Sequence, residues 1–207
     1  DLHKTTIVIP SQRAKKHFGE GLKKSIHKNF ISPKLITIDD FICEKFNGHI
    51  IKGFELQLFL YDVYKRVSKN PDSLDQFINY SNQILSDFNI VDRYLLDTKH
   101  LIFDLKSISE IETWSLSTKD LTQNQKKFAD YFKLLGDIYT CFQKELKDKN
   151  RATNGMIYKS IACNCDSYLK QVNNTYFIGL NALSKAEEKI INYLVESNKA
   201  KVIFDGD

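Results

Sequence analysis

Near its start the chain reads Thr5-Thr6-Ile7-Val8-Ile9-Pro10-Ser11-Gln12-Arg13. β-branched residues favour strands, so the run that ends at Pro10 predicts a short buried strand. Ser11 is a suitable N-terminal cap for the helix that should follow. The apolar residues behind it recur at every fourth position, as they do on one face of a helix: Ala14, Phe18, Leu22 and Ile26. The chain therefore begins with a strand and an amphipathic helix.

The same pair of elements is then repeated. Pro33 opens a second apolar run at residues 34–38, and Asp39 or Asp40 is placed to cap the apolar helix that comes next. A β-α-β-α order is the unit that builds a parallel sheet by right-handed crossovers. The first 50 residues therefore predict one side of an α/β sheet.

The strand signal stops near residue 54 and returns near residue 175. Helical periodicity predicts helices at residues 54–66, 74–90 and 128–146. A strand is then predicted at residues 175–180. A capping box, Ser184-x-x-Glu187, and a last apolar run at residues 201–204 follow it.

We expect residues 1–53 and 171–207 to share one parallel sheet, and residues 54–170 to form an all-helical insertion. The fold class is α/β, mostly helical by content, since three prolines and eight glycines leave few helix breakers. The apolar runs at 7–9, 35–38 and 202–204 look too apolar for edge strands. We therefore expect 201–204 to pair with a strand from the first 50 residues.

Positive charge is concentrated at the N-terminus. Residues 2–34 carry eight Lys or Arg and the single acid Glu20, a net charge of +7 in a chain whose total is +4. Residues 72–120, by contrast, hold nine acids and four bases. A basic segment at a helix N-terminus is suited to phosphates, and the acidic middle is not. A lysine-rich helix face can equally be a solvated surface.

Phosphate-loop chemistry is absent from the sequence. None of the eight glycines is followed by lysine, so the motif G-x-x-x-x-G-K-[ST] is not present. We therefore expect no ATP-driven reaction, no catalytic residue and no cofactor. The close cysteine pair Cys163-x-Cys165 lacks a second pair with ligand spacing, so we expect reduced thiols and no metal.

A nominal nuclease pattern occurs in the predicted insertion. It consists of Pro71-Asp72 followed by Asp97-x-Lys99 or Asp104-x-Lys106. Nuclease metal ligands have to converge, and residues on helix caps and faces are poorly placed for that, so we expect none of this chemistry here. Asp39-Asp40 and the pair Asp205 and Asp207 fit capping and turn roles. The aromatic residues between 128 and 142 have helical spacing, which favours core packing over base stacking.

No run approaches the roughly 18 apolar residues that span a bilayer, so we expect a soluble cytoplasmic protein without membrane contact. The only methionine is Met156, and the chain stops on an apolar run. We therefore expect the chain to be a piece of a longer protein.

Five short segments occur along the chain: IVIPSQRA at 7–14, LITIDDF at 35–41, LYDVY at 60–64, ILSDFNIVD at 84–92 and FIGLNALS at 177–184. In this order they resemble the N-terminal region of AddB-type helicase–nuclease subunits, in the branch whose superfamily I helicase module is inactivated. The resemblance implies a P-loop-like helicase subdomain 1A for the α/β part and subdomain 1B for the insertion. It also implies a PD-(D/E)XK nuclease domain far downstream of these residues, and thus a whole protein that is a nuclease of DNA repair and recombination.

The resemblance also implies roles for two places in the chain. Residues 10–13 stand where active relatives keep the motif whose helix N-terminus meets single-stranded DNA. Leu180 and Asn181 stand at the Walker B position, where an active motor has its acids, so no magnesium ligand or water-orienting base is left there.

The leading hypothesis is a non-catalytic DNA-binding scaffold within a repair helicase–nuclease. Its expected partners are single-stranded or unwinding DNA and a helicase–nuclease partner subunit. The expected nucleic-acid-binding residues are Ser11, Gln12, Arg13, Lys15 and Lys16. An alternative makes the helical block a protein-interaction platform that docks the motor subunit. A third hypothesis is an unrelated small α/β enzyme.

Overall fold

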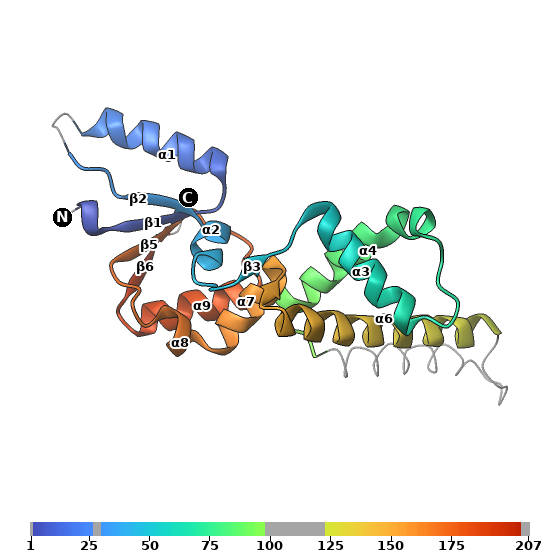
Figure 1. Ribbon diagram of the computed structural model, residues 1–207. Helices are drawn as coiled ribbons and strands as arrows, with labels where there is room; N and C mark the ends of the chain where they lie inside the picture. The colour runs from blue at the N-terminus through green and yellow to red at the C-terminus, as the bar shows by residue number, and fades with distance from the viewer. Residues whose placement is uncertain (1, 27–29, 98–122, 204–207) are drawn as a thin grey trace, which may run out of the picture. The chain divides into compact units, whose positions relative to one another are not determined.

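The computed structural model describes residues 2–26, 30–97 and 123–203, with the backbone alone for 123–129. Contacts divide the chain into two compact units, residues 1–47 with 157–207 and residues 48–156. We call them the sheet unit and the helical unit. Most of the described residues are helical, in agreement with the prediction from the scarcity of proline and glycine (Figure 1).

The sheet unit is built on four parallel strands in the order β2-β1-β5-β6. They are β1 (Thr6–Ile9), β2 (Lys34–Thr37), β5 (Thr175–Ile178) and β6 (Ala200–Ile203). In β1, Ile7 lies opposite Leu35 of β2 on one side and opposite Tyr176 of β5 on the other. The two ends of the chain therefore share one parallel sheet, and the α/β class is confirmed.

The last strand lies at an edge of this sheet. β6 pairs with β5, from Thr175 opposite Ala200 to Ile178 opposite Ile203, and no other described strand adjoins it. The expectation that it pairs with the first 50 residues is therefore wrong. Lys201 is exposed and Ile203 is 47% exposed, so β6 alternates between inside and outside as an edge strand does. The alternation could not be predicted from the sequence, because the residues at both exposed and buried positions of this strand include apolar ones.

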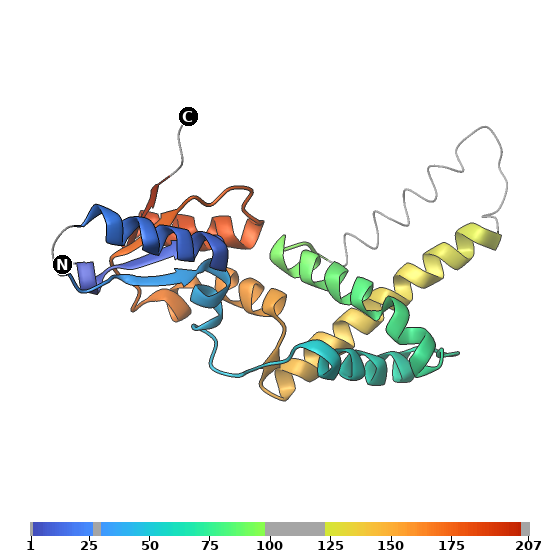
Figure 2. The same ribbon diagram turned by 90° about the horizontal axis from the view of Figure 1, so that it is seen from above.

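Helices cover both faces of the sheet. Helix α1 (Gln12–Ser25) lies on one face and α9 (Lys185–Glu196) on the other (Figures 1 and 2). Gly19 of α1 lies close to Leu35 of β2. A Cβ atom added to Gly19 would lie 3.3 Å from Cδ1 of Leu35. On the opposite face the Phe177 ring meets the Phe41 ring edge-on at 5.7 Å. Phe41 belongs to α2 (Ile38–Cys43).

Two of the three predicted caps are correct. Ser11 Oγ accepts the N–H of Ala14, and Ser184 and Glu187 form the capping box of α9. For α2 the prediction of Asp39 or Asp40 is wrong, because the Thr37 hydroxyl accepts the N–H of Asp40. The helix begins at Ile38. The apolar pattern had predicted this residue as the last one of the strand.

The shorter elements of the sheet unit are η1 (Leu2–Lys4) and α8 (Cys165–Leu169). Helix α7 (Asn154–Cys163) contains the division between the units. The contacts thus place the boundaries near residues 47 and 156, where the sequence suggested 53 and 170.

The helical unit contains α3 (Gly53–Val67), α4 (Leu74–Arg93) and α6 (Gln123–Asp148). It also holds β3 (His49–Ile50) and β4 (Arg151–Ala152), which pair in parallel. The prediction that residues 54–170 are all helical is therefore wrong at β4. Its two residues are too few for a period-2 pattern to be visible in the sequence. In the described ranges, no helix has both the length and the apolar character required to cross a bilayer.

Aromatic and aliphatic side chains fill the core of the helical unit. The rings of Tyr64 and Phe77 stack at 4.6 Å, and the rings of Phe88 and Phe142 lie 5.8 Å apart. Phe142 is 1% exposed, which confirms that the aromatic stripe of α6 belongs to the core at this position. Tyr131, near the other end of the described stripe, is 49% exposed.

A buried carboxylate ties α4 to α6. Asp92 is 1% exposed, and its Oδ1 accepts the Tyr139 hydroxyl at 2.5 Å. Gln143 Nε2 donates to both Asp92 oxygens, at 2.7 and 2.8 Å. Burial raises the pKa of Tyr139, and the Asp92 charge adds to the effect, so the phenol remains a donor. A buried carboxylate is tolerated because its oxygens are satisfied in this way.

The start of α7 packs against this part of α4. A Cβ on Gly155 would lie 2.8 Å from Asn89 Oδ1 and 3.1 Å from both Asn89 Cα and Asp92 Cβ. Gly155 is therefore required for close approach. This gives a structural role to the segment Asn154-Gly155-Met156, for which the sequence offered none.

We predict opposite effects of Gly→Ala at two helical glycines. Gly155→Ala should lower the free energy of unfolding by about 1–3 kcal/mol, because overpacking displaces Asn89 and Asp92. Gly21→Ala in α1 meets nothing within 4 Å, so it should raise stability by about 0.5–1 kcal/mol. Urea unfolding followed by circular dichroism measures both. Equal stabilisation by the two changes would contradict the close packing of α7 on α4.

Candidate nucleic-acid interface

The direction in which the chain builds the sheet reverses between β1 and β5. After β1 the chain passes through α1 to β2, towards one edge of the sheet. After β5 it passes through α9 to β6, towards the opposite edge. In open α/β sheets, ligands bind outside the carboxyl ends of the strands at such a reversal. The residues after Ile9 and after Ile178 therefore form the natural candidate site.

The turn after β1 is held by side chains from two connections. Ser11 is the N-cap of α1, and its hydroxyl accepts the Ala14 N–H at 3.2 Å. Gln12 Nε2 donates to Asp40 Oδ2 at 2.9 Å, and Thr37 Oγ1 donates to the same oxygen at 2.7 Å. The start of α1 is thereby fixed to the start of α2.

Arg13, Lys15 and Lys16 occupy the beginning of α1. Arg13 and Lys16 are exposed and Lys15 is half-buried. None of the three has an ion-pair partner within the described part of the chain. Their charges are therefore available to an external anion.

Placing these cations there opposes the helix dipole. The N-terminus of a helix carries partial positive charge, which acids stabilise and bases do not. The first turn of α1 contains no acid, as is also true of α6 and α7, whereas the first turns of α2, α3, α4 and α9 each contain at least one. A bound anion would compensate for this repulsion in α1.

Two carboxylates lie at the same edge of the sheet and limit the positive charge. Asp40 contacts Gln12, as described, and Asp39 Oδ1 accepts the Tyr158 hydroxyl at 2.6 Å. Both aspartates are exposed. The sequence indicated only capping and turn roles for acid pairs such as this one. The proximity of Gln12 and Asp40 follows from the parallel pairing of β1 and β2, which brings the two turns to one edge.

The turn after β5 carries little reactive chemistry. Gly179 has φ +64°, in the left-handed region that glycine adopts freely, and Leu180 is 5% exposed. Asn181 is exposed, and Ala182 has φ +52°, which is strained for an L-residue. Leu180 thus packs inward, and Asn181 presents an amide to solvent and not a carboxylate.

Of the nominal nuclease pattern, only Pro71, Asp72 and Asp97 lie in the described ranges. Asp72 accepts the hydroxyls of Tyr64 and Tyr80, at 3.2 and 2.5 Å, between α3 and α4. The remaining partners of the nuclease pattern, Lys99, Asp104 and Lys106, lie outside the described residues, as do Asp205 and Asp207. In the described ranges no three His, Cys, Asp or Glu side chains are grouped to hold a metal ion.

We predict that the chain neither binds nor hydrolyses ATP. The turn after β1 offers Ser11 and Gln12 in place of a glycine-lysine loop, and Leu180 and Asn181 supply no magnesium ligand. Calorimetric titration with Mg-ATP should give no saturable heat, and phosphate release with single-stranded DNA present should stay at background. Saturable micromolar binding would contradict this description of the sheet edge.

The sequence matches no protein-family model and no curated protein. The resemblance to AddB-type subunits therefore rests on the five sequence segments alone.

Proposed function

We propose that this chain is a non-catalytic module that holds single-stranded DNA through the N-terminal turn of α1. The observation that carries the proposal is the unneutralised cationic start of that helix, at the carboxyl edge of the sheet. Phosphates are bound by helix N-terminal amides together with Arg and Lys. Exposed Arg13 and Lys16 supply the charge, and Lys15 adds to it.

Binding at this place is weak and independent of sequence. A few phosphate contacts give an affinity that falls steeply with salt, because each contact releases counterions from the strand. The carboxylates of Asp39 and Asp40 at the same edge reduce the attraction further. The chain then acts as a scaffold that guides a strand within a larger DNA-repair assembly, as the resemblance implies.

A second function, docking of a partner protein, is favoured by a different observation. Among the described residues of the helical unit, five large apolar side chains are exposed. They are Phe54 at 57%, Tyr131 at 49%, Ile90 at 48%, Tyr94 at 47% and Leu96 at 38%. Exposed apolar side chains of this size suit a protein interface when they gather in one patch.

We predict that Arg13→Glu, Lys15→Glu and Lys16→Glu together abolish binding of oligothymidylate, measured by fluorescence anisotropy. For the wild type, the logarithm of affinity should fall with the logarithm of salt concentration. The slope is about 0.7 for each phosphate contacted on a single strand, so three contacts contribute about 2. Glutamates at residues 13 and 15 also complement the helix dipole, so the variant should unfold at no lower temperature.

The matched control changes the same net charge elsewhere. Lys69→Glu, Lys133→Glu and Lys147→Glu alter three exposed lysines of the helical unit that have no ion-pair partner within the described residues. This variant should keep most of the wild-type affinity. Equal losses in the two triple variants would show that net charge alone attracts the DNA, and docking of a protein would then be the better function.

We also predict that Asp40→Asn strengthens binding several-fold. The change removes a negative charge beside Gln12 and leaves an amide oxygen to accept from Thr37 and Gln12. The gain should shrink as salt is raised, since an exposed charge is screened. Glu44→Gln is the control, because that carboxylate is already paired with Lys34 at 2.6 Å. An unchanged affinity for Asp40→Asn would place the DNA away from this edge.

A further inference from the structure

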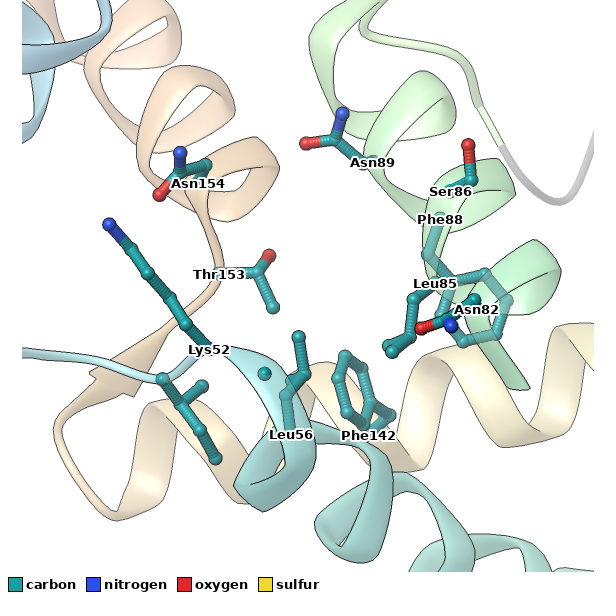
Figure 3. A pocket seen from close by; sticks show the side chains of 12 residues that line it. Lys52, Leu56, Asn82, Leu85, Ser86, Phe88, Asn89, Phe142, Thr153 and Asn154 are labelled. Carbon is teal, nitrogen blue, oxygen red and sulfur yellow. The ribbon is translucent and has the colours of Figure 1, made fainter. Parts of the chain in front are cut away.

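The helical unit contains a pocket of about 400 Å³ between the start of α3, the middle of α4 and the β4–α7 turn (Figure 3). Its volume lies within the range of small-ligand sites. The pocket belongs to one unit only and does not include the residues assigned to DNA. Nothing derived above for the sheet edge gives it a function.

The apolar part of the pocket is aliphatic at its surface. Leu56 and Leu85 are partly exposed, whereas the Phe88 and Phe142 rings are 8% and 1% exposed. Buried rings offer no open face on which a nucleic-acid base could stack. The floor therefore suits a compact apolar side chain better than a planar base.

The polar part of the pocket favours a negative group. Lys52 is the one charged residue in its lining, which contains no carboxylate. Lys52 lies on one side of the pocket, and Ser86 and Asn89 of α4 lie on the other (Figure 3). The side chains of these three residues have no hydrogen-bond or ion-pair partner among the described residues. The nearest acid of α3, Glu55, is paired with Arg151 at 2.8 Å.

The backbone reinforces this preference. Helix α3 starts beside the pocket with no side-chain cap, and Gly53 there has φ +60°. Its first-turn N–H groups are therefore left for an external acceptor. In the β4–α7 turn, the hydroxyl of Thr153 is occupied as an acceptor for the Met156 N–H at 3.3 Å.

We propose that this pocket binds the carboxyl terminus of a partner polypeptide that ends in an aliphatic residue. The terminal carboxylate lies between Lys52 and the start of α3, and the last side chain lies on Leu56 and Leu85. The amide and hydroxyl groups of Asn89 and Ser86 pair with the peptide backbone, which offers both donors and acceptors. Capture of a terminal carboxylate by backbone N–H groups is an established mode of peptide recognition. The inference does not depend on DNA binding by the sheet unit.

The test uses the full chain, labelled with ¹⁵N, and the probe acetyl-Gly-Ala-Leu with a free carboxyl group. Saturable shifts are expected at the amides of Lys52, Gly53, Leu85 and Ser86. The same peptide with a carboxamide end should bind about tenfold more weakly or worse, because a charge-assisted hydrogen bond is lost. Acetyl-Gly-Ala-Gly should also bind more weakly, since it leaves Leu56 and Leu85 uncovered.

Variants separate the pocket from general charge. Lys52→Glu should abolish the shifts, and Lys69→Glu, at another exposed lysine of the same unit, should leave the affinity unchanged. A leucine peptide that binds equally well as acid and as carboxamide, shifts that do not saturate, or an unchanged affinity in Lys52→Glu would each overturn the proposal. Saturation of these amides by deoxyadenosine monophosphate without any response to the peptide would also overturn it, in favour of a nucleotide site.

Discussion

The pairing of β1 with both β2 and β5 is the constraint on which the sheet unit depends. It brings Val8, which is fully buried, beside Ile36 and Phe177, although Phe177 is far away in the sequence. The sheet therefore requires segments that lie far apart in the sequence, residues 6–37 and 175–203. The same pairing creates the reversal of direction between β1 and β5, and the start of α1 follows β1 at this reversal.

The helical unit depends on a buried polar cluster and on one close contact between helices. Asp92 joins α4 to α6 through Tyr139 and Gln143, and Gly155 lets the start of α7 approach the same stretch of α4. A buried polar cluster of this kind favours one arrangement of helices, because leaving the carboxylate unpaired is costly. The helices joined in this way also line the pocket, α4 with Leu85 and Phe88 and α6 with Phe142.

Much of the fold could be predicted from the sequence because the signals are local. The β-branched run at Ile7, the Ser11 cap and the Ser184–Glu187 capping box each carry their own information, and the structure contains all three. The cap of α2 was a local error, since Thr37 shortly precedes in the sequence the two aspartates that were predicted. The other errors arose where the outcome depends on long-range pairing. The edge position of β6 and the two-residue β4 are set by partners distant in the chain, and no periodicity in either segment reveals them. Asp40 beside Gln12 was missed for the same reason.

The central claim is that α1 begins where single-stranded DNA is held. The most direct measurement is the change in ¹⁵N amide shifts of the full chain during titration with a short oligothymidylate at low salt. The N–H groups of Gln12 and Arg13 have no acceptor within the helix, so a bound phosphate should shift them most, together with Lys15 and Lys16. Shifts confined to the helical unit, or spread evenly over the exposed lysines of both units, would contradict the account.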